Sequence, residues 1–484
     1  MLQLSSAIGA RTAPVFHRCR VVVIGGGFSG ASVARQLALC DGVEKDGVVI
    51  FEPRKRIGAG LAYDTTDPSL RLNVAAHRMR ALPGRPEAFA EWHARTGRLA
   101  ADPRAVAGEH VFARRGDFGE FMATQMAPLI EQERIVHRRE QVVHVTRRAD
   151  LWLVTGEAGS SVLADELIIA TGQPGPRAPK AIASALNGHP RLVADGLKGE
   201  WLSHVRTNDR VLVFGAGLTA ADVVGQLAGR GHAGVITLLS RSGLLPQVQS
   251  VSDVEPFGDF SVFSPRSGRQ LLQRVRATVA EAESQGLSWQ SVFDALRQQG
   301  QTIWAGLPLE EQARLLRHLK RQFETRRYRL PPQNARIMHD RFEAGLLRHR
   351  AGRICRIERS RHEISVDVIK KPAGTVERLV TDWAVVATGP DFGSVITSQP
   401  WLAELERLGF VATDPLGLGI ACDRTSRAIG RDGYPIDSLF IAGPLARGTF
   451  GELTGAPEIA TQADQIARTI IARRTSARTT CDLV

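Results

Sequence analysis

The chain has 484 residues, of which 43% are hydrophobic and 23% are charged, and its formal net charge at pH 7 is +12. A chain of this length exceeds what one hydrophobic core organises, so we expect two or three domains. The composition is that of an ordinary soluble protein, and no apolar run approaches the roughly 20 residues of a membrane-spanning helix. The apolar run near the N-terminus is too short for a secretory signal, so we expect a cytoplasmic protein that does not contact a membrane.

The positive net charge does not by itself indicate a nucleic-acid-binding protein. The arginines are spread along the chain rather than gathered with aromatic residues, and no signature of a nucleic-acid-binding module is present. The charge instead favours an attraction for small anionic substrates. The five cysteines form no CxxC pair, which argues against a redox-active dithiol and against a structural zinc site. We therefore predict no nucleic-acid partner and no bound metal.

The clearest motif lies at residues 21–37, where a buried strand is followed by a glycine-rich turn and then by a helix. Three glycines of this turn have the GxGxxG spacing, namely Gly25, Gly27 and Gly30. Such a turn lets the backbone approach a pyrophosphate closely, and the positive N-terminal end of the helix points at it. The next strand ends at Glu52, which is placed to accept hydrogen bonds from a ribose. The motif predicts a site for the adenine end of FAD or NAD.

The same pattern repeats at residues 211–220 in the form GxGxxA. Its marked positions are Gly215, Gly217 and Ala220. Here the following strand ends in Ser240 and Arg241 rather than in an acid. An arginine in place of the acid favours the 2′-phosphate of NADP over the free ribose of NAD. We therefore expect the second site to bind NADPH, with NADH as the alternative.

Each copy continues into an antiparallel meander and then into a strand that ends in Ala-Thr-Gly. In the first copy these small residues place Thr171 and Gly172 close to the cofactor. The second copy is longer, and helices predicted at about residues 265–345 account for the excess. The expected fold class is α/β, with two Rossmann-like dinucleotide-binding domains and a helical insertion. The predicted domain boundaries are 18–200 and 392–475 for the two parts of an FAD-binding domain and 203–391 for an NAD(P)H-binding domain.

The two glycine turns, the two Ala-Thr-Gly strands and a late strand ending at Gly443 and Pro444 together resemble the two-dinucleotide-binding flavoproteins. The resemblance implies FAD in the first site, NAD(P)H in the second, and a helix beginning near residue 456 that points at the flavin. Residues 58–79 are similar to the "GxGxAYxT…LNVxAxxM" signature of a bacterial family of FAD-NAD(P)-binding proteins, which includes an FAD-dependent urate hydroxylase and L-aspartate N-monooxygenases. Residues 112–121, 240–246, 289–331 and 443–462 are also similar to that family. The chain departs from the pattern of that family at Ala75, at residues 326–329 and at Gly451. Many members of the family have tryptophan at the position of Gly451.

The resemblance implies an oxidoreductase that uses FAD and NAD(P)H to insert one oxygen atom of O2 into a small anionic, nitrogen-rich substrate. The main prediction is urate hydroxylation to 5-hydroxyisourate, as part of purine metabolism. The alternative is N-hydroxylation of a small amino acid such as L-aspartate. An NAD(P)H-dependent flavin reductase that passes electrons to a protein partner, and a flavin-bearing binding module without turnover, also stay open. The sequence does not indicate the oligomeric state.

The catalytic candidates are Arg447, His77 and Arg80. Arg447 is the first choice for a clamp on an anionic substrate, because it lies between the last glycine strand and the last helix; Arg80 and Arg115 come next. His77 is placed to donate a proton or else serves as a structural histidine.

Other residues are predicted to have supporting roles. Asn73 and Glu452 are interpreted as contacts in the flavin loops rather than as acid–base groups. We expect the glycine-rich residues 58–65 to form a loop. Trp289 and Trp304 are interpreted as core packing within the helical insertion.

Overall fold

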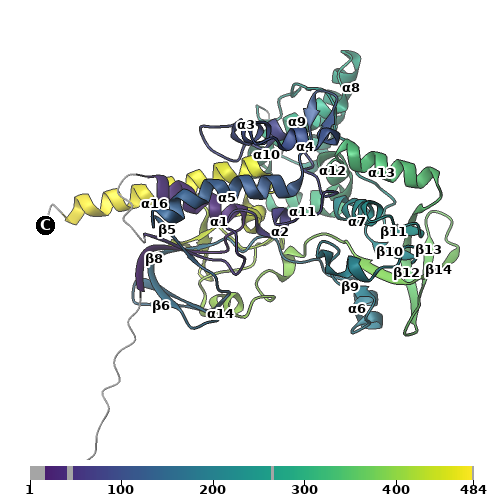
Figure 1. Cartoon of the computed structure of the whole chain (residues 1–484). Helices are drawn as coiled ribbons and strands as arrows, with labels where there is room; N and C mark the ends of the chain where they lie inside the picture. Colours follow the sequence, from purple (N-terminus) through teal and green to yellow (C-terminus); the bar gives the residue numbers. More distant parts are fainter. Residues whose placement is uncertain (1–16, 41–46, 263–265, 482–484) are drawn as a thin grey trace, which may run out of the picture.

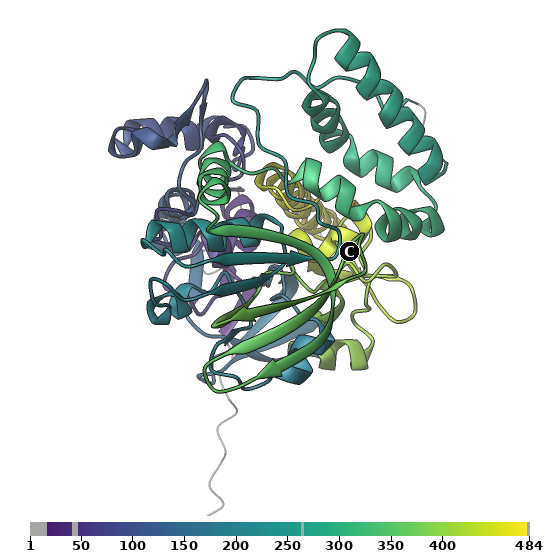
Figure 2. The ribbon, with the colours of Figure 1, turned by 90° about the vertical axis from the view of Figure 1, so that its right-hand side faces the viewer.

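The structure, a computed structural model, describes residues 17–40, 47–262 and 266–481, and it describes side chains as far as residue 473. Residues 1–16, on which the prediction about a secretory signal depends, lie outside the described residues. The described chain forms two large sheets in two lobes, which lie on the left and right of Figure 1. A group of helices from the middle of the chain lies apart from the two sheets, at the upper right of Figure 2.

The first sheet is built around β1, which has a parallel partner on each side. The strand order is β16-β17-β8-β1-β2-β5, and β6 and β7 extend β8 as an antiparallel hairpin. Residues 21–23 are fully buried, because both faces of a central parallel strand are covered. The strands are β1 (His17–Ile24), β2 (Val48–Phe51), β5 (Ile135–Arg138), β6 (Val142–Arg148), β7 (Leu151–Gly156), β8 (Ser161–Ile169), β16 (Arg427–Ile429) and β17 (Pro435–Ile441).

Three helices cover one face of this sheet: α1 (Phe28–Leu39), α5 (Arg115–Glu131) and α16 (Ala456–Cys481). The helices α1 and α16 lie side by side although they come from opposite ends of the chain (Figure 1). The opposite face packs on Trp152 and on α14 (Pro400–Leu408). Short elements connect these layers: α2 (Gly60–Tyr63), η1 (Ala76–Arg78), α3 (Ala88–Arg95), α4 (Arg98–Ala101), η2 (Pro103–Ala105), β3 (Val106–Ala107), β4 (His110–Val111) and η4 (Phe392–Ser394).

The second sheet repeats the parallel core and adds a meander. Its order is β14-β13-β12-β11-β10-β15-β9, with β10 parallel to both β11 and β15. The helices α7 (Leu218–Gly229) and α13 (Pro332–Glu343) pack on one face and α6 (Lys180–Leu186) on the other, with η3 (Gly199–His204) at an edge. The strands are β9 (Leu192–Val193), β10 (Val211–Phe214), β11 (Ile236–Ser240), β12 (Leu347–Arg359), β13 (Ile364–Lys370), β14 (Val376–Thr381) and β15 (Trp383–Val386). The predicted α/β fold class with two Rossmann-like units is confirmed.

The insertion has a small hydrophobic core of its own. Its helices before α13 are α8 (Gly268–Ser284), α9 (Trp289–Gln298), α10 (Gly300–Gly306), α11 (Leu309–His318) and α12 (Lys320–Arg327). Trp289 packs edge-on against Phe293 in this core, as expected. The expectation for Trp304 is wrong, because its indole N–H donates instead to the carbonyl oxygen of Gly448 at 2.7 Å, outside the insertion.

Residues 58–65 are also not a simple loop. Residues 60–63 form the single helical turn α2, which packs against α5. The approach is close, because a Cβ atom on Gly119 of α5 would lie 2.4 Å from the carbonyl oxygen of Tyr63.

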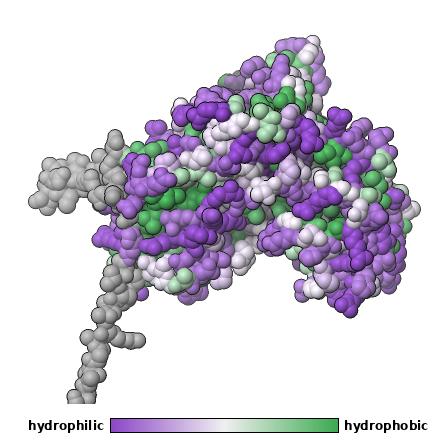
Figure 3. Space-filling model, in the orientation of Figure 1, coloured by the Kyte–Doolittle hydropathy of each residue, from purple (hydrophilic) through white to green (hydrophobic). Residues whose placement is uncertain are grey.

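Hydrophilic residues cover most of the face seen in Figure 3, with hydrophobic residues in small separate patches. Among the described helices, none combines the length and the apolar composition that crossing a membrane requires.

Candidate active site

The first glycine turn joins β1 to α1 and has no space for side chains. Gly25 has φ +100°, and a Cβ atom there would lie 2.4 Å from the carbonyl oxygen of Ala170. A Cβ atom on Gly30 would lie 1.9 Å from the carbonyl oxygen of Gly25. Gly27 is the N-cap of α1, and no side chain caps this helix end. The free N–H groups and the helix dipole therefore form a site for a phosphate group.

Glu52 follows β2 at the edge of this turn and is 3% exposed. Its carboxylate accepts hydrogen bonds from the backbone N–H groups of Gly26 at 2.9 Å and Arg54 at 3.0 Å. These contacts fix the carboxylate beside the turn, and a carboxylate has further lone pairs for ribose hydroxyl groups. The geometry thus suits the ribose contact predicted for Glu52.

Two other segments meet the first turn at the carboxyl ends of β8 and β17. Ala170, directly before Thr171 and Gly172, donates its N–H to the carbonyl oxygen of Ile24 at 2.8 Å. Gly443 has φ +73°, and a Cβ atom there would lie 2.1 Å from the hydroxyl oxygen of Ser29 in α1. Gly443 and Pro444 begin η5 (Gly443–Ala446). The first glycine turn, Glu52 and the ends of β8 and β17 therefore gather at one edge of the sheet, where α/β folds bind ligands.

The second glycine turn has the same geometry between β10 and α7. Gly215 has φ +134°, and a Cβ atom there would lie 2.1 Å from the carbonyl oxygen of Ala387. Gly217 is the N-cap of α7 and no side chain caps it, while Ala220 is fully buried within that helix. This helix end is therefore also open to a phosphate group.

Ser240 and Arg241 lie at the end of β11, next to the second turn. The hydroxyl of Ser240 accepts a hydrogen bond from the N–H of Gly243 at 3.1 Å and lies 3.3 Å from Nε2 of His349. Burial and the neighbouring Arg350 lower the pKa of His349, so this imidazole is neutral at pH 7. Arg241 is exposed, so its guanidinium can reach an anionic group on a bound nucleotide.

Arg447 begins α15 (Arg447–Phe450) where the C-terminal segment meets the insertion. Its side chain is half-buried, yet it forms no ion pair with a carboxylate of any described residue. Its Nη2 lies 3.5 Å from the hydroxyl of Tyr328, and its guanidinium lies 5.7 Å from the ring centre of Phe392. Burial raises the pKa of Tyr328, which keeps that hydroxyl protonated as a donor. Arg447 is therefore a cation that a substrate carboxylate could pair with.

Glu452 is engaged in a contact that the sequence did not indicate. Its carboxylate forms an ion pair with Arg327 of α12 at 2.9 Å. Burial of Arg327 is the largest single effect and opposes its charge, but Glu452, Tyr328 and Glu458 together outweigh it and raise the pKa of Arg327. The structure thus places the Glu452 side chain against the insertion. An acid and an arginine this far apart in the sequence carry no local pattern that would reveal the pair.

Asn73 and Arg115 lie where the first unit meets the second. The amide oxygen of Asn73 lies 3.5 Å from Nη2 of Arg115, and the Asn73 carbonyl accepts a hydrogen bond from Gln249 at 2.9 Å. Arg115 also forms an ion pair with Asp222 of α7 at 2.8 Å. Burial raises the pKa of Asp222, and Arg115 opposes that shift. Arg115 therefore forms a contact between the two units. The one sign of this ion pair in the sequence is Asp222, a single acidic residue on the buried side of α7.

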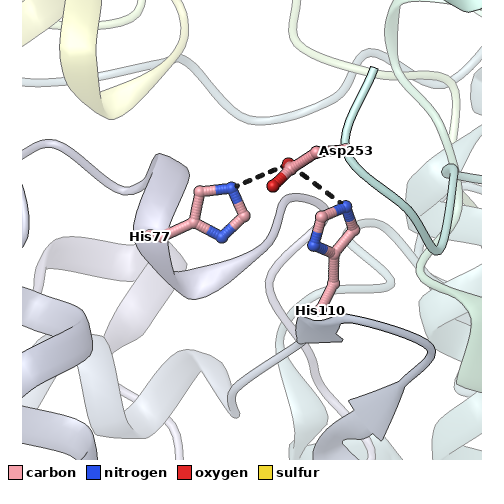
Figure 4. Close-up of side chains that lie close together, drawn as sticks. All are labelled: His77, His110 and Asp253. Carbon is pink, nitrogen blue, oxygen red and sulfur yellow. Dashed lines mark ion pairs between the residues drawn. The ribbon is translucent and has the colours of Figure 1, made fainter. Parts of the chain in front are cut away.

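His77 and Arg80 lie in different surroundings. His77 lies in η1 with its Nε2 3.4 Å from Oδ1 of Asp253, and His110 approaches the same oxygen (Figure 4). Burial lowers the pKa of His77 and Asp253 opposes that shift, with burial the larger effect. Arg80 is exposed and forms no ion pair with any described residue. The structure does not bring Arg80 together with Arg447.

Comparisons with known proteins agree with the cofactor expectations. Residues 22–174 match a family model described as FAD-NAD(P)-binding. No curated protein matches the chain in a sequence comparison.

Solved structures match almost the whole chain. An ornithine N-hydroxylase from Kutzneria sp. 744 matches with a TM-score of 0.63 and 19% identity, over 95% of this chain and 100% of that one. L-lysine 6-monooxygenase from Pseudomonas syringae matches with a TM-score of 0.63 and 16% identity, over 94% and 99%. A cadaverine monooxygenase from Erwinia amylovora, bound to FAD, matches with a TM-score of 0.60 and 13% identity, over 93% and 94%. The chain therefore has the fold of N-hydroxylating flavin monooxygenases.

Proposed function

We propose that this protein is an FAD-dependent, NAD(P)H-using monooxygenase that hydroxylates the amine nitrogen of a small amino acid. The observation that carries the proposal is the agreement in fold, over nearly the full length of both chains, with enzymes named for acting on ornithine, lysine and cadaverine. The two glycine turns support it independently, because a chain that oxidises a nicotinamide cofactor with a flavin needs two dinucleotide sites.

The described residues fit both cofactors. The crowded Gly25 and Gly30 and the uncapped end of α1 suit the pyrophosphate of FAD, with Glu52 beside its ribose. The uncapped end of α7 suits the pyrophosphate of NADPH, with Arg241 beside its 2′-phosphate. Bound FAD would supply the redox chemistry with O2, and the protein supplies position, field and exclusion of water.

Arg447 is the residue that we assign to the substrate. A half-buried guanidinium without an acidic partner attracts a carboxylate and can hold it with two parallel hydrogen bonds. The protonated hydroxyl of Tyr328 lies beside it and can donate a further hydrogen bond. A carboxylate fixed in this way would leave the amino group of the same molecule directed away from Arg447. An amino acid has the carboxylate that this arrangement would bind, and a simple diamine does not.

Urate hydroxylation rests only on the resemblance to the bacterial family described above. The matched monooxygenases are named for amine substrates, which favours the amine nitrogen as the site of oxygen insertion. We therefore place N-hydroxylation before urate hydroxylation, and urate belongs in the substrate panel as a direct competitor.

The test is a substrate panel on the FAD-loaded protein under ¹⁸O2. L-aspartate, L-ornithine, L-lysine, cadaverine and urate are compared for stimulation of NADPH oxidation, and products are identified by mass. We expect one amino acid to yield a product carrying one ¹⁸O atom per NADPH oxidised. Labelled 5-hydroxyisourate from urate would replace this proposal with the urate reaction. Reduction of a ferredoxin or a dye without oxygen incorporation from any substrate would overturn both in favour of a reductase.

A further inference from the structure

Three side chains that are distant in the sequence converge where the first lobe meets the segment leading to the insertion. His77 comes from η1, His110 from β4, and Asp253 from the segment that follows β11. Figure 4 shows both imidazole rings directed at the carboxylate of Asp253. The Nε2 atoms lie 3.4 Å (His77) and 3.7 Å (His110) from Oδ1 of Asp253. The three candidate ligand atoms all lie within 4.8 Å of one another.

These separations are too long for good hydrogen bonds, for which N···O distances are about 2.7–3.2 Å. His110 is 3% exposed, and neither of its ring nitrogens has a hydrogen-bond partner among the described residues. The three groups therefore lie close together without forming good hydrogen bonds to one another.

The separations instead suit ligand atoms around one ion. Zinc bonds to imidazole nitrogen and carboxylate oxygen are about 2.0–2.2 Å long, so neighbouring ligands of a tetrahedral site lie about 3.4 Å apart. The two N···O distances, 3.4 Å and 3.7 Å, are close to this value before any ion is bound. The third separation, between the ring nitrogens of the two histidines, is at most 4.8 Å.

We propose that His77, His110 and Asp253 bind a divalent transition-metal ion, with Zn²⁺ as the ion to test first. Two imidazoles and one carboxylate are a common ligand set for such ions. The side chain of Asp253 is 67% exposed, so water can reach the ion and complete its coordination. The prediction of no metal site came from the cysteine spacing, and these three residues form no sequence motif.

One cation competes for the carboxylate. Nη2 of Arg78 lies 3.5 Å from Oδ1 of Asp253, but Nη1 of the same arginine pairs with Asp294 at 3.0 Å. Arg78 therefore keeps an acidic partner when the ion takes Asp253. The carboxylate of Glu109 also accepts a hydrogen bond from the N–H of Asp253 at 3.2 Å, and its negative charge favours a cation nearby.

The ion would tie the segment before the insertion to the first lobe. This segment is already docked there, since the N–H of Glu109 donates to the carbonyl oxygen of Val251 at 2.8 Å. A Cβ atom on Gly108 would lie 2.3 Å from the same oxygen. Ligands on both sides of this contact make the site a structural clamp, and its occupancy does not depend on the proposed hydroxylation.

The test measures metal binding by the full-length protein. Protein stripped with a chelator is titrated with Zn²⁺ in competition with a chromogenic zinc indicator, in a Cys355→Ser background that removes the exposed thiol among the described side chains. We expect one tight site per chain. We expect Asp253→Asn and His77→Ala each to weaken zinc binding at least about 100-fold, since even changes to residues that only orient metal ligands cost 10–100-fold. Asp253 is exposed, so its replacement should not disturb folding.

His339→Ala and Asp340→Asn, two exposed positions on α13, are the matched controls and should keep the site. Bound Co²⁺ should show the intense visible absorption of a tetrahedral site without a thiolate charge-transfer band. Equal zinc affinity in the parent protein and in both Asp253→Asn and His77→Ala would overturn the proposal. Absence of a tight site in the parent protein would do the same.

Discussion

Arg327 of α12 donates to the carboxylate of Glu452 at 2.9 Å, with 8% and 6% of the two side chains exposed. A second ion pair joins Arg297 of α9 to Glu458 of α16 at 2.7 Å. The hydrogen bond from Trp304 to Gly448 joins the same two regions. The insertion is therefore fastened to the segment that carries Arg447, and the position of Arg447 depends on these contacts.

We predict that Glu452→Gln destabilises the protein by about 3–5 kcal/mol, because it leaves the guanidinium of Arg327 buried without a counter-charge. The double variant Arg327→Met/Glu452→Gln should recover part of this loss, since it removes the unpaired charge. The measurement is the urea midpoint monitored by tryptophan fluorescence. A double variant that is as unstable as the sum of the two single variants would contradict the interpretation.

Gly30→Ala is predicted to weaken FAD binding about 10- to 100-fold, the effect of about 1–3 kcal/mol of overpacking at the turn. The added methyl group would lie 1.9 Å from the carbonyl oxygen of Gly25, so the turn must shift. The measurement is titration of the apoprotein with FAD by flavin fluorescence. Gly175→Ala is the matched control, because a Cβ atom there has no neighbour within 4 Å. Unchanged FAD affinity in Gly30→Ala would place the flavin elsewhere.

Arg447→Ala should lower kcat/KM for the amino acid substrate about 10- to 100-fold, as expected for loss of a charge-assisted hydrogen bond. Arg447→Lys should recover only part of this, because an ammonium group cannot make the two parallel bonds of a guanidinium. Steady-state kinetics with the substrate found in the panel provide the measurement. Arg336→Ala, on a side chain that is 85% exposed on α13, is the control. Loss of bound FAD rather than of substrate affinity would reassign Arg447 to the flavin.

Arg241→Ala is expected to raise KM for NADPH about 10-fold or more and to leave KM for NADH unchanged. The physical reason is that only NADPH carries the 2′-phosphate that this exposed guanidinium would pair with. Initial rates of flavin reduction with each cofactor distinguish the two effects. An equal change with both cofactors would show that Arg241 does not read the 2′-phosphate.

The pair of Arg210 and Asp382 predicts a dependence of stability on pH. Hydrogen bonds from Arg210, at 3.0 and 3.1 Å from its side chain, lower the pKa of Asp382. A carboxyl whose pKa is lower in the folded state stabilises the protein above its unfolded pKa of about 4, and this is lost as the pH falls through the folded pKa.

Asp382→Asn should therefore cost about 1–2 kcal/mol at pH 7, a modest value because the side chain of Arg210 is 42% exposed. The difference from the parent protein should shrink below about pH 4. Urea midpoints at several pH values measure it. Asp150→Asn, in an exposed turn, is the control. A difference that stays constant down to pH 3 would show that the carboxylate charge is not responsible.

One departure from the family pattern has a physical reason that only the tertiary structure shows. Gly451 stands where tryptophan is common in the resembling family, and the sequence offers no reason for the change. In the structure, Trp304 covers this position from α10, and a Cβ atom on Gly451 would lie 2.6 Å from its indole ring. The reason is a packing contact between two segments far apart in the chain.

The two glycine turns, the β-strands around them and the acid after β2 could be predicted from the sequence, because each depends on residues close together in the chain. A turn that must approach a pyrophosphate excludes side chains, and that exclusion is visible as glycine at fixed spacing. The partners of Glu452, Arg115 and His77 were decided only by the tertiary structure. Arg327 and Glu452 are 125 positions apart, and such pairs leave no spacing to recognise. Ion pairs and metal sites require only that charged atoms meet in space, so folding, not local sequence, determines which residues form them.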